Sequence, residues 1–175
     1  MAVSLRLRPL LTGEYVSYRL VPHGPRSSAR EVAEAARVPA SLFAKVVVLR
    51  DAAGGYMMVV VPATARAHVG AVAAASGRSG LRLATERELQ DLFPDCDVGA
   101  MPPFGSLYGL PVFADASLRD QPELFFRGGG HDEVVGMLWA DYKSLARPIV
   151  GQWCLRTKPG SAWRSAAPRP FLAAV

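Results

Sequence analysis

FAKVVVLRDAAGGYMMVVV, residues 43–61, contains two apolar, valine-rich runs separated by a short segment with two glycines. Valine, phenylalanine and tyrosine favour the pleated, half-buried surface of a strand. Two such runs joined by a short glycine-containing segment are typical of a β-hairpin. The stretch therefore predicts strands at residues 43–50 and 56–61, with a turn at residues 51–55.

Lys45 lies inside the first apolar run. Because side chains alternate between the two faces of a strand, Lys45 shares its face with Phe43 and Val47. Burying an ammonium on such a face is costly unless the charge is paired. Two interpretations stay open. Lys45 is either a cation at the edge of a pocket that meets a phosphate or a carbonyl, or a lysine at a strand end whose amine reaches water.

The remaining chain shows strand and helix signals without a regular βαβ alternation. Strands are expected at residues 15–20, 81–84, 110–114, 124–127 and 134–139, and helices at residues 28–37, 64–76, 86–92 and 141–147. The expected capping residues of these helices are Ser27 or Ser28, Thr64, Thr85 with Glu88, and Asp141. This pattern favours an α+β class with a mixed sheet. We expect one compact domain over residues 1–155, followed by a basic tail, residues 156–175.

Charge and composition limit the possible partners and compartments. The net charge is +5, and the tail carries four basic residues and no acidic one, which fits either an RNA partner or merely a basic tail. No apolar run reaches 18 residues, and residues 1–11 lack the apolar core of a signal peptide. Cys96 and Cys154 are far apart, as expected for free thiols in a reducing compartment. We therefore expect a cytoplasmic protein without a membrane partner.

Several common sites are absent from the sequence. It contains no phosphate-binding G-x-x-x-x-G-K-[ST] motif, no dinucleotide-binding G-x-G-x-x-G motif and no G-x-S-x-G nucleophile motif. The three histidines, at positions 23, 68 and 131, are scattered, and the two cysteines are not clustered. Neither a metal site nor a cofactor is therefore predicted.

Asp97-Val98-Gly99-Ala100-Met101-Pro102-Pro103-Phe104-Gly105 is too apolar for an ordinary surface loop and too rich in Gly and Pro for a helix. Proline fixes φ, and glycine lets a ligand approach the backbone closely. The segment predicts a stiff loop whose terminal N–H groups can bind a small substrate, opposite Lys45.

His131 follows Gly128-Gly129-Gly130 at the start of a predicted strand. It is either a pocket wall that contacts a polar group of the substrate or a surface histidine on a loose turn. His23 precedes a Gly-Pro turn and is expected to be structural or exposed. The neighbouring pair Asp132-Glu133 is expected to form a solvated face and not to act as a general base.

The following elements occur in this order along the chain: Lys45, the loop of residues 99–105, Pro111-Val112-Phe113-Ala114-Asp115 and Gly128-Gly129-Gly130-His131. The order is that of the YbaK/EbsC family, which the chain resembles over roughly residues 15–150. The G-x-x-x-P element, matched by Gly99 to Pro103, and the strand lysine carry most of the resemblance. The family consists of free-standing aminoacyl-tRNA editing proteins related to the insertion domain of prolyl-tRNA synthetase. The tail after Leu155 has no counterpart in the family pattern.

The resemblance implies a compact α+β domain around a mixed, partly barrel-like sheet, and hydrolysis of the ester between tRNA and a wrong amino acid. It implies no metal, no cofactor and no protein nucleophile. The substrate is expected to be the acceptor end of an aminoacyl-tRNA that carries a small residue (Ala, Cys, Ser or Thr), with a synthetase as a second partner. A non-catalytic module that binds tRNA ends or a synthetase, and a hydrolase of another small acyl ester, stay open.

The expected site follows from this resemblance. Lys45, Gly99 and Gly105 are the expected catalytic residues, with loop N–H groups holding the ester carbonyl and Lys45 holding the terminal phosphate or the aminoacyl group. The expected substrate contacts are Ala100, Met101, Pro102, Pro103, Phe104, Gly130 and His131. The attacking group is expected to be water, aided by a ribose hydroxyl of the substrate.

Overall fold

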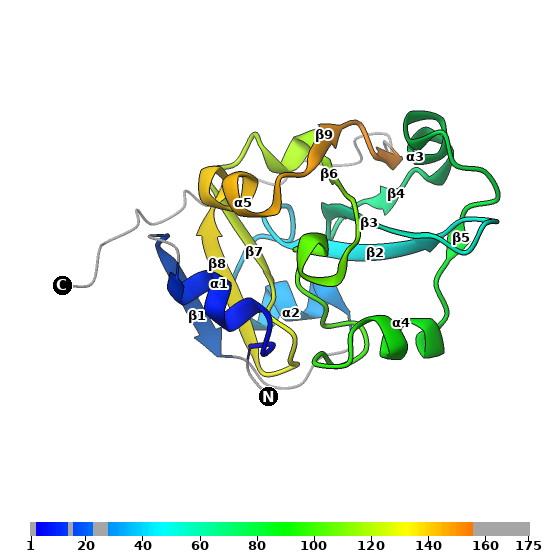
Figure 1. Ribbon diagram of the computed structural model, residues 1–175. Coiled ribbons are helices and arrows are strands. Elements are labelled where there is room, and N and C mark those ends of the chain that lie inside the picture. The colour runs from blue at the N-terminus through cyan, green and yellow to red at the C-terminus, as the bar shows by residue number, and fades with distance from the viewer. Residues whose placement is uncertain (1–2, 14–15, 23–27, 156–175) are drawn as a thin grey trace.

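The hairpin predicted from residues 43–61 forms the centre of the fold (Figure 1). The computed structural model describes residues 3–13, 16–22 and 28–155. Strand β2 (Ala44–Arg50) pairs antiparallel with β3 (Tyr56–Pro62) over their full lengths, from Ala44 opposite Pro62 to Arg50 opposite Tyr56. The turn closes with the Asp51 amide donating to the Gly55 carbonyl at 2.8 Å. The predicted hairpin is confirmed.

Three further strands extend this hairpin into a five-stranded mixed sheet. On one side, β6 (Val112–Asp115) runs parallel to β3, and β9 (Ile149–Gly151) runs parallel to β6. On the other side, β5 (Arg82–Leu83) is a short antiparallel edge strand beside β2. The strand order is β5-β2-β3-β6-β9. The predicted α+β class with a mixed sheet is confirmed.

A second sheet lies against the beginning of β2. It contains β1 (Tyr18–Pro22), β8 (Glu133–Leu138) and β7 (Glu123–Arg127) in the antiparallel order β1-β8-β7. A parallel bridge between Phe43 and Phe125, with the Phe125 amide donating to the Leu42 carbonyl at 2.9 Å, joins the two sheets. Strands β4 (Arg66–Ala67) and β10 (Cys154–Leu155) form a separate pair. The described strands therefore curve together without forming a closed barrel.

Helices surround these sheets. They are α1 (Leu7–Gly13), α2 (Ala29–Ala35), α3 (Val69–Ser76), α4 (Glu86–Leu92) and α5 (Trp139–Ala146), with 3₁₀ turns at Gly105–Tyr108 and Ala116–Leu118. Ser28 caps α2 and Thr85 caps α4, each in a reciprocal capping box with a glutamate three residues later. Both of these capping predictions are confirmed.

Two predicted caps are wrong. Thr64 does not begin a helix, because the chain first forms β4 against β10, and His68 then caps α3 by accepting the Ala71 amide at its Nδ1. Asp141 lies in the first turn of α5, where a carboxylate suits the helix dipole, and Leu138 is the N-cap residue. His23 and the tail of residues 156–175 lie outside the described residues. None of the described helices is long and apolar enough to cross a bilayer.

The main core packs between the two larger sheets. Its aromatic centre is Phe104, whose ring centroid lies 5.5 Å from that of Phe126 and 5.4 Å from that of Tyr142, both in edge-to-face geometry. All three side chains are fully buried. Because Phe104 belongs to the loop predicted to bind a ligand, the core itself holds part of this loop in place.

Candidate active site

A cavity of about 260 Å³ lies where the beginning of β2, the beginning of α2, the end of β7 and the loop after α4 meet. Its lining consists of Ser28, Ala29, Phe43, Ala44, Lys45, Val46, Gly99, Met101 and Arg127. Lys45, Gly99 and Met101 were all predicted as site residues, and the fold brings them together. The lining contributed by the described residues contains two cations and no carboxylate. Such a site favours a ligand with oxygen acceptors or negative charge.

Lys45 is fixed beside the cavity by a backbone contact. Its Nζ donates to the Ala65 carbonyl at 2.7 Å. Partial burial, with a smaller contribution from the charge of Arg66, lowers the pKa of Lys45 below its usual 10.5. A carbonyl satisfies one donor of the ammonium and leaves its charge in place, so Lys45 keeps further donors for a ligand.

The loop enters the cavity through a tight turn. The Ala100 amide donates to the Asp97 carbonyl at 2.9 Å, and Gly99 has a φ of +83°. A positive φ at the third residue of such a turn is typical of type II and strongly favours glycine. The positive φ is therefore the reason that glycine is required at position 99. Space is not the reason, since an added Cβ would lie an ordinary 3.8 Å from Arg127 Nη1.

Arg127 was not predicted as a site residue. It is the last residue of β7, its exposed fraction is 5%, and its Nη1 donates to the Gly99 carbonyl at 2.9 Å. Burial lowers the pKa of Arg127, and the nearby charge of Glu31 opposes this effect. The available signal was similar to the one that singled out Lys45, a cation in an apolar strand, although Arg127 ends its strand and is followed by three glycines.

The second half of the loop packs into the core and does not line the cavity. Residues 100–105 are buried, and the Pro103 carbonyl accepts the hydroxyl of Tyr142 at 3.1 Å. An added Cβ on Gly105 would lie 2.6 Å from both the Leu110 carbonyl oxygen and a methyl of Val112, so close packing requires glycine there. The substrate or catalytic roles expected for Ala100, Pro102, Pro103, Phe104 and Gly105 stay predictions, and their observed contacts anchor the loop.

The Gly-Gly-Gly-His turn contacts the start of the loop through its backbone. The Asp97 amide donates to the Gly129 carbonyl at 2.7 Å, and the Ser4 amide donates to the Gly128 carbonyl at 2.7 Å. Gly129 has a φ of +123°, and an added Cβ would lie 2.7 Å from that of Ser4. Gly130 is buried and His131 is partly buried, and neither lines the cavity. Their expected substrate contacts stay predictions.

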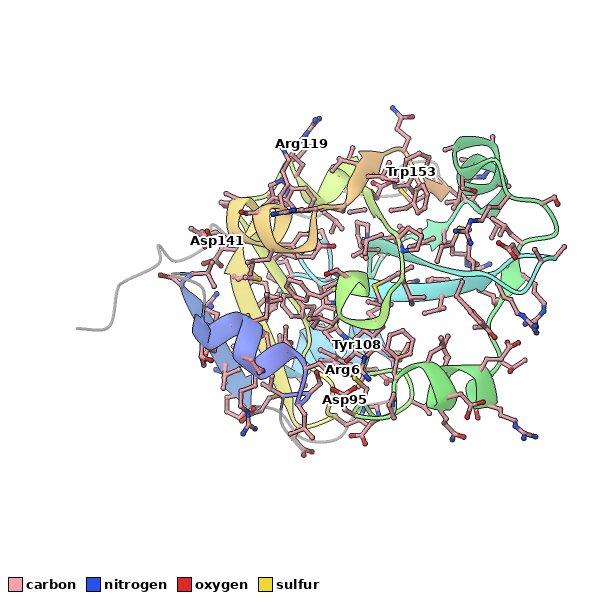
Figure 2. All side chains as sticks on the ribbon, in the orientation of Figure 1. Arg6, Asp95, Tyr108, Arg119, Asp141 and Trp153 are labelled. Carbon is pink, nitrogen blue, oxygen red and sulfur yellow. The ribbon has the colours of Figure 1, made fainter. Side chains whose placement is uncertain are left out.

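The N-terminal segment also braces the loop region, and α1 was not predicted. Figure 2 shows Arg6, Asp95 and Tyr108 together. The Arg6 amide donates to Asp95 Oδ2 at 3.1 Å, and its Nη1 donates to the Leu107 carbonyl at 2.9 Å. Its guanidinium lies 5.2 Å from the centroid of the Tyr108 ring. These contacts tie residues on both sides of the loop to the N-terminal segment.

Cys96, close to the same loop, has the properties of a structural thiol. Its Sγ lies 3.2 Å from the Tyr108 hydroxyl, and burial raises its pKa to about 11. A thiol with such a pKa is a poor nucleophile near neutral pH. Among the described residues, no three His, Cys, Asp or Glu side chains are placed to bind a metal ion together.

Sequence comparison establishes the family. The model of the aminoacyl-tRNA editing domain matches residues 23–145, well over half of the chain. The chain belongs to the aminoacyl-tRNA editing domain family. This matched region contains all of the residues that line the cavity. No curated protein sequence matches the chain.

Solved structures share the fold of this editing domain at low sequence identity. The hypothetical protein APE2540 superposes with a TM-score of 0.77 at 20% identity, covering 86% of this chain and 99% of that one. A protein described as a candidate trans-editing enzyme for prolyl-tRNA synthetase superposes with a TM-score of 0.73 at 22% identity, covering 86% and 96%. A scaffold used for computational epitope grafting gives a TM-score of 0.75 at 20% identity, covering 87% and 96%. These likenesses establish the fold.

Proposed function

We propose that this editing domain is a free-standing deacylase that hydrolyses the ester between a tRNA and a wrongly attached small amino acid. The observation that carries the proposal is the convergence of Lys45, Gly99 and Met101 on one cavity within the family-matched region. The fold shared with a protein described as a candidate trans-editing enzyme also supports it.

In the proposed mechanism, the loop binds the ester carbonyl through backbone N–H groups. Pro102 and Pro103 have no N–H, and the Ala100 amide already donates to Asp97. The donors available at the cavity are therefore those of Gly99 and Met101, the two loop residues that line it. Donors fixed before the reaction stabilise the negative charge that develops on the carbonyl oxygen.

Lys45 has the complementary role. Its ammonium, held by the Ala65 carbonyl, binds the terminal phosphate or the aminoacyl group and so fixes the ester against the loop. A water molecule attacks the carbonyl carbon, and the bond to the ribose oxygen breaks, which releases the amino acid and the free tRNA end. A neighbouring ribose hydroxyl of the substrate assists this water. An aminoacyl ester is already activated, so positioning and charge stabilisation supply much of the acceleration.

The cavity volume favours small side chains. About 260 Å³ is below the roughly 300–1,000 Å³ of typical small-molecule sites. Its walls include the apolar side chains of Phe43, Val46 and Met101. We therefore propose Ala, Cys, Ser or Thr as the attached residue, with larger side chains excluded by size. One methylene contributes only about 1–3 kcal/mol to such discrimination, so measurable side activities are expected within this group.

The test is a deacylation assay with a panel of tRNAs charged with Ala, Cys, Ser, Thr and larger residues, together with their binding affinities. The proposal predicts hydrolysis of at least one small aminoacyl-tRNA and slow hydrolysis of those with large side chains. Binding without turnover on every member would contradict it and indicate a tRNA-binding module. Turnover of simple acyl esters but of no aminoacyl-tRNA would indicate a different hydrolase.

A further inference from the structure

Arg127 is the buried cation of the cavity that the proposed mechanism does not use. It ends a strand in which all five residues are buried, and its exposed fraction is only 5%. Burying a guanidinium is costly, so an arginine kept at such a position has strong contacts that offset the cost. One of these contacts is with the Gly99 carbonyl, at 2.9 Å from Nη1.

This hydrogen bond acts on a single peptide unit. The unit between Gly99 and Ala100 presents its oxygen to Arg127 and its N–H to the Asp97 carbonyl, at 2.9 Å each. A peptide unit is planar, so bonds at both ends fix its orientation. The N–H groups of Gly99 and Met101 belong to the units immediately before and after it. Their direction therefore depends on the plane that Arg127 holds.

Glycine makes this restraint necessary. Gly99 lacks a Cβ and reaches its φ of +83° without steric guidance from a side chain, so its backbone is also free to leave that conformation. A charge-assisted hydrogen bond is about twice as strong as a neutral one, and the guanidinium is rigid and planar. Asp97, at the start of the turn, is held separately by the Gly129 carbonyl.

We propose that Arg127 is a positioning residue that locks the Gly99–Ala100 peptide unit and so aims the N–H groups of Gly99 and Met101 at the reacting carbonyl. This inference rests on the proposed deacylase function. It assigns to Arg127 an effect on the rate of the chemical step, because the donors it orients act on the charge of the transition state. An arginine that only bound the ground-state substrate would act on KM.

The first test measures the loop without measuring activity. Hydrogen–deuterium exchange of the segment 97–101 is compared in the wild type, Arg127→Ala and the exposed control Arg119→Ala, whose side chain is 63% exposed. We expect faster exchange of this segment in Arg127→Ala only. If Arg127→Ala does not fold, Arg127→Met retains the apolar stem and replaces it. Unchanged exchange in a folded variant would overturn the inference, whatever the turnover.

The second test measures kinetics on the best substrate of the tRNA panel. Arg127→Ala is expected to lower kcat roughly 10- to 100-fold with KM nearly unchanged, since small misplacements of catalytic groups have effects of this size. Arg127→Lys should lie between it and the wild type, and added guanidinium should restore part of the kcat of Arg127→Ala. An unchanged kcat, or a loss confined to KM, would overturn the inference. A wild type without turnover would instead refute the proposed function, and the exchange result would still decide the role of Arg127 in the loop.

Discussion

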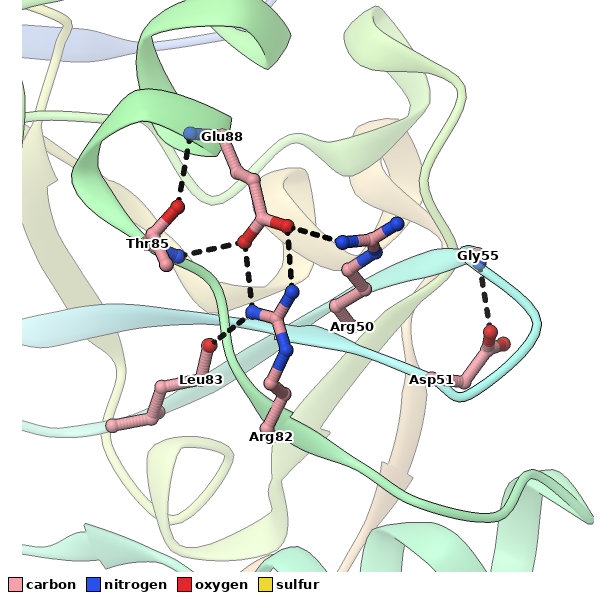
Figure 3. Close-up of polar contacts among 7 residues, drawn as sticks. All are labelled: Arg50, Asp51, Gly55, Arg82, Leu83, Thr85 and Glu88. Atoms are coloured by element: carbon pink, nitrogen blue, oxygen red, sulfur yellow. Dashed lines mark hydrogen bonds and ion pairs between the residues drawn. The ribbon is translucent and has the colours of Figure 1, made fainter.

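The two ends of β2 carry cations in contrasting surroundings. At its far end, Arg50 and Arg82 both donate to the carboxylate of Glu88, at 2.7 Å for the shortest contact of each (Figure 3). At its near end, Lys45 donates to the Ala65 carbonyl, and across the cavity Arg127 donates to the Gly99 carbonyl.

Cations at the two ends of β2 have pKa values that shift in opposite directions. The carboxylate of Glu88 raises the pKa of Arg82, whereas burial is the first cause that lowers the pKa of Lys45 and of Arg127. A cation paired with a carboxylate has its charge largely neutralised, and an exposed pair contributes little to stability. Lys45, which is partly buried and donates to a carbonyl, keeps its charge at a cost. The near end of β2, with its cations beside the cavity, is therefore where we propose that a ligand binds, whereas the cations of the far end are paired within the fold.

The largest expected effect is a loss of turnover when Lys45, and not an exposed lysine, is substituted. Lys45→Ala is expected to lower the turnover of the best aminoacyl-tRNA about 100-fold, the size found for removal of one charge-stabilising donor. Lys143→Ala, which removes an exposed lysine of α5, is the matched control and should leave turnover unchanged. Initial deacylation rates measure both. Equal rates for Lys45→Ala and the wild type would remove the functional distinction between the two ends of β2.

A second pair of variants compares a positive-φ glycine at the cavity with one outside the cavity. Gly99→Ala and Gly77→Ala both place a Cβ at a positive φ, +83° and +66°, and neither meets a close steric contact. Each should lower the free energy of unfolding by roughly 1–2 kcal/mol. Only Gly99→Ala should also lower turnover, because the turn that aims the loop donors relaxes. Chemical denaturation and deacylation rates measure the two effects, and equal turnover of the two variants would count against the role of the Gly99 turn.

A third change affects the structural end alone. Thr85→Ala removes the cap of α4 and should lower the free energy of unfolding by about 1 kcal/mol. The cap that is lost is the Thr85 hydroxyl, which accepts the Glu88 amide. The two arginines keep the Glu88 carboxylate as their partner. Turnover should stay at the wild-type value. A loss of turnover without a loss of stability would show that the far end of β2 takes part in catalysis.

The smallest effect concerns pH. The pKa of Lys45 is lowered by burial and, secondarily, by Arg66. Its cationic form is lost as the pH rises through this lowered pKa, so kcat/KM should fall at a lower pH than for an ordinary lysine. Arg66→Ala removes one of the two causes, and the alkaline fall should move to higher pH. Rates are corrected for spontaneous ester hydrolysis. An alkaline fall that stays in place or moves to lower pH would exclude Lys45 as the group responsible.

Local chemistry predicted much of the fold and part of the site. The hairpin of β2 and β3, the capping box of α4 and the N-cap of α2 depend on residues that are near in sequence, and all three were predicted. Lys45 was singled out because a cation in an apolar strand has a cost that the sequence itself reveals. The loop of residues 99–105 was identified from its glycine and proline content.

The rest depends on partners distant in sequence. Only packing against Phe126 and Tyr142 assigns Phe104 to the core and leaves Gly99 and Met101 at the cavity. Arg127 donates a hydrogen bond to a carbonyl 28 residues away in sequence, and Arg6 donates to groups about 90 to 100 residues away. Neither contact can be predicted from neighbouring residues. Helix α1 was missed for the same reason, since long-range contacts hold the segment that contains it.

The most direct test locates the ligand. The protein is titrated with a non-hydrolysable amide analogue of 3′-aminoacyl-adenosine while backbone amide resonances are followed by nuclear magnetic resonance. We expect shifts concentrated at residues 44–46, at residues 99–101 and at Arg127, which line or adjoin the cavity. Resonances of Arg50, Arg82 and Glu88 should stay unchanged. Shifts centred on that outer cluster, with none at the cavity, would contradict the assignment of the aminoacyl end to the cavity beside Lys45.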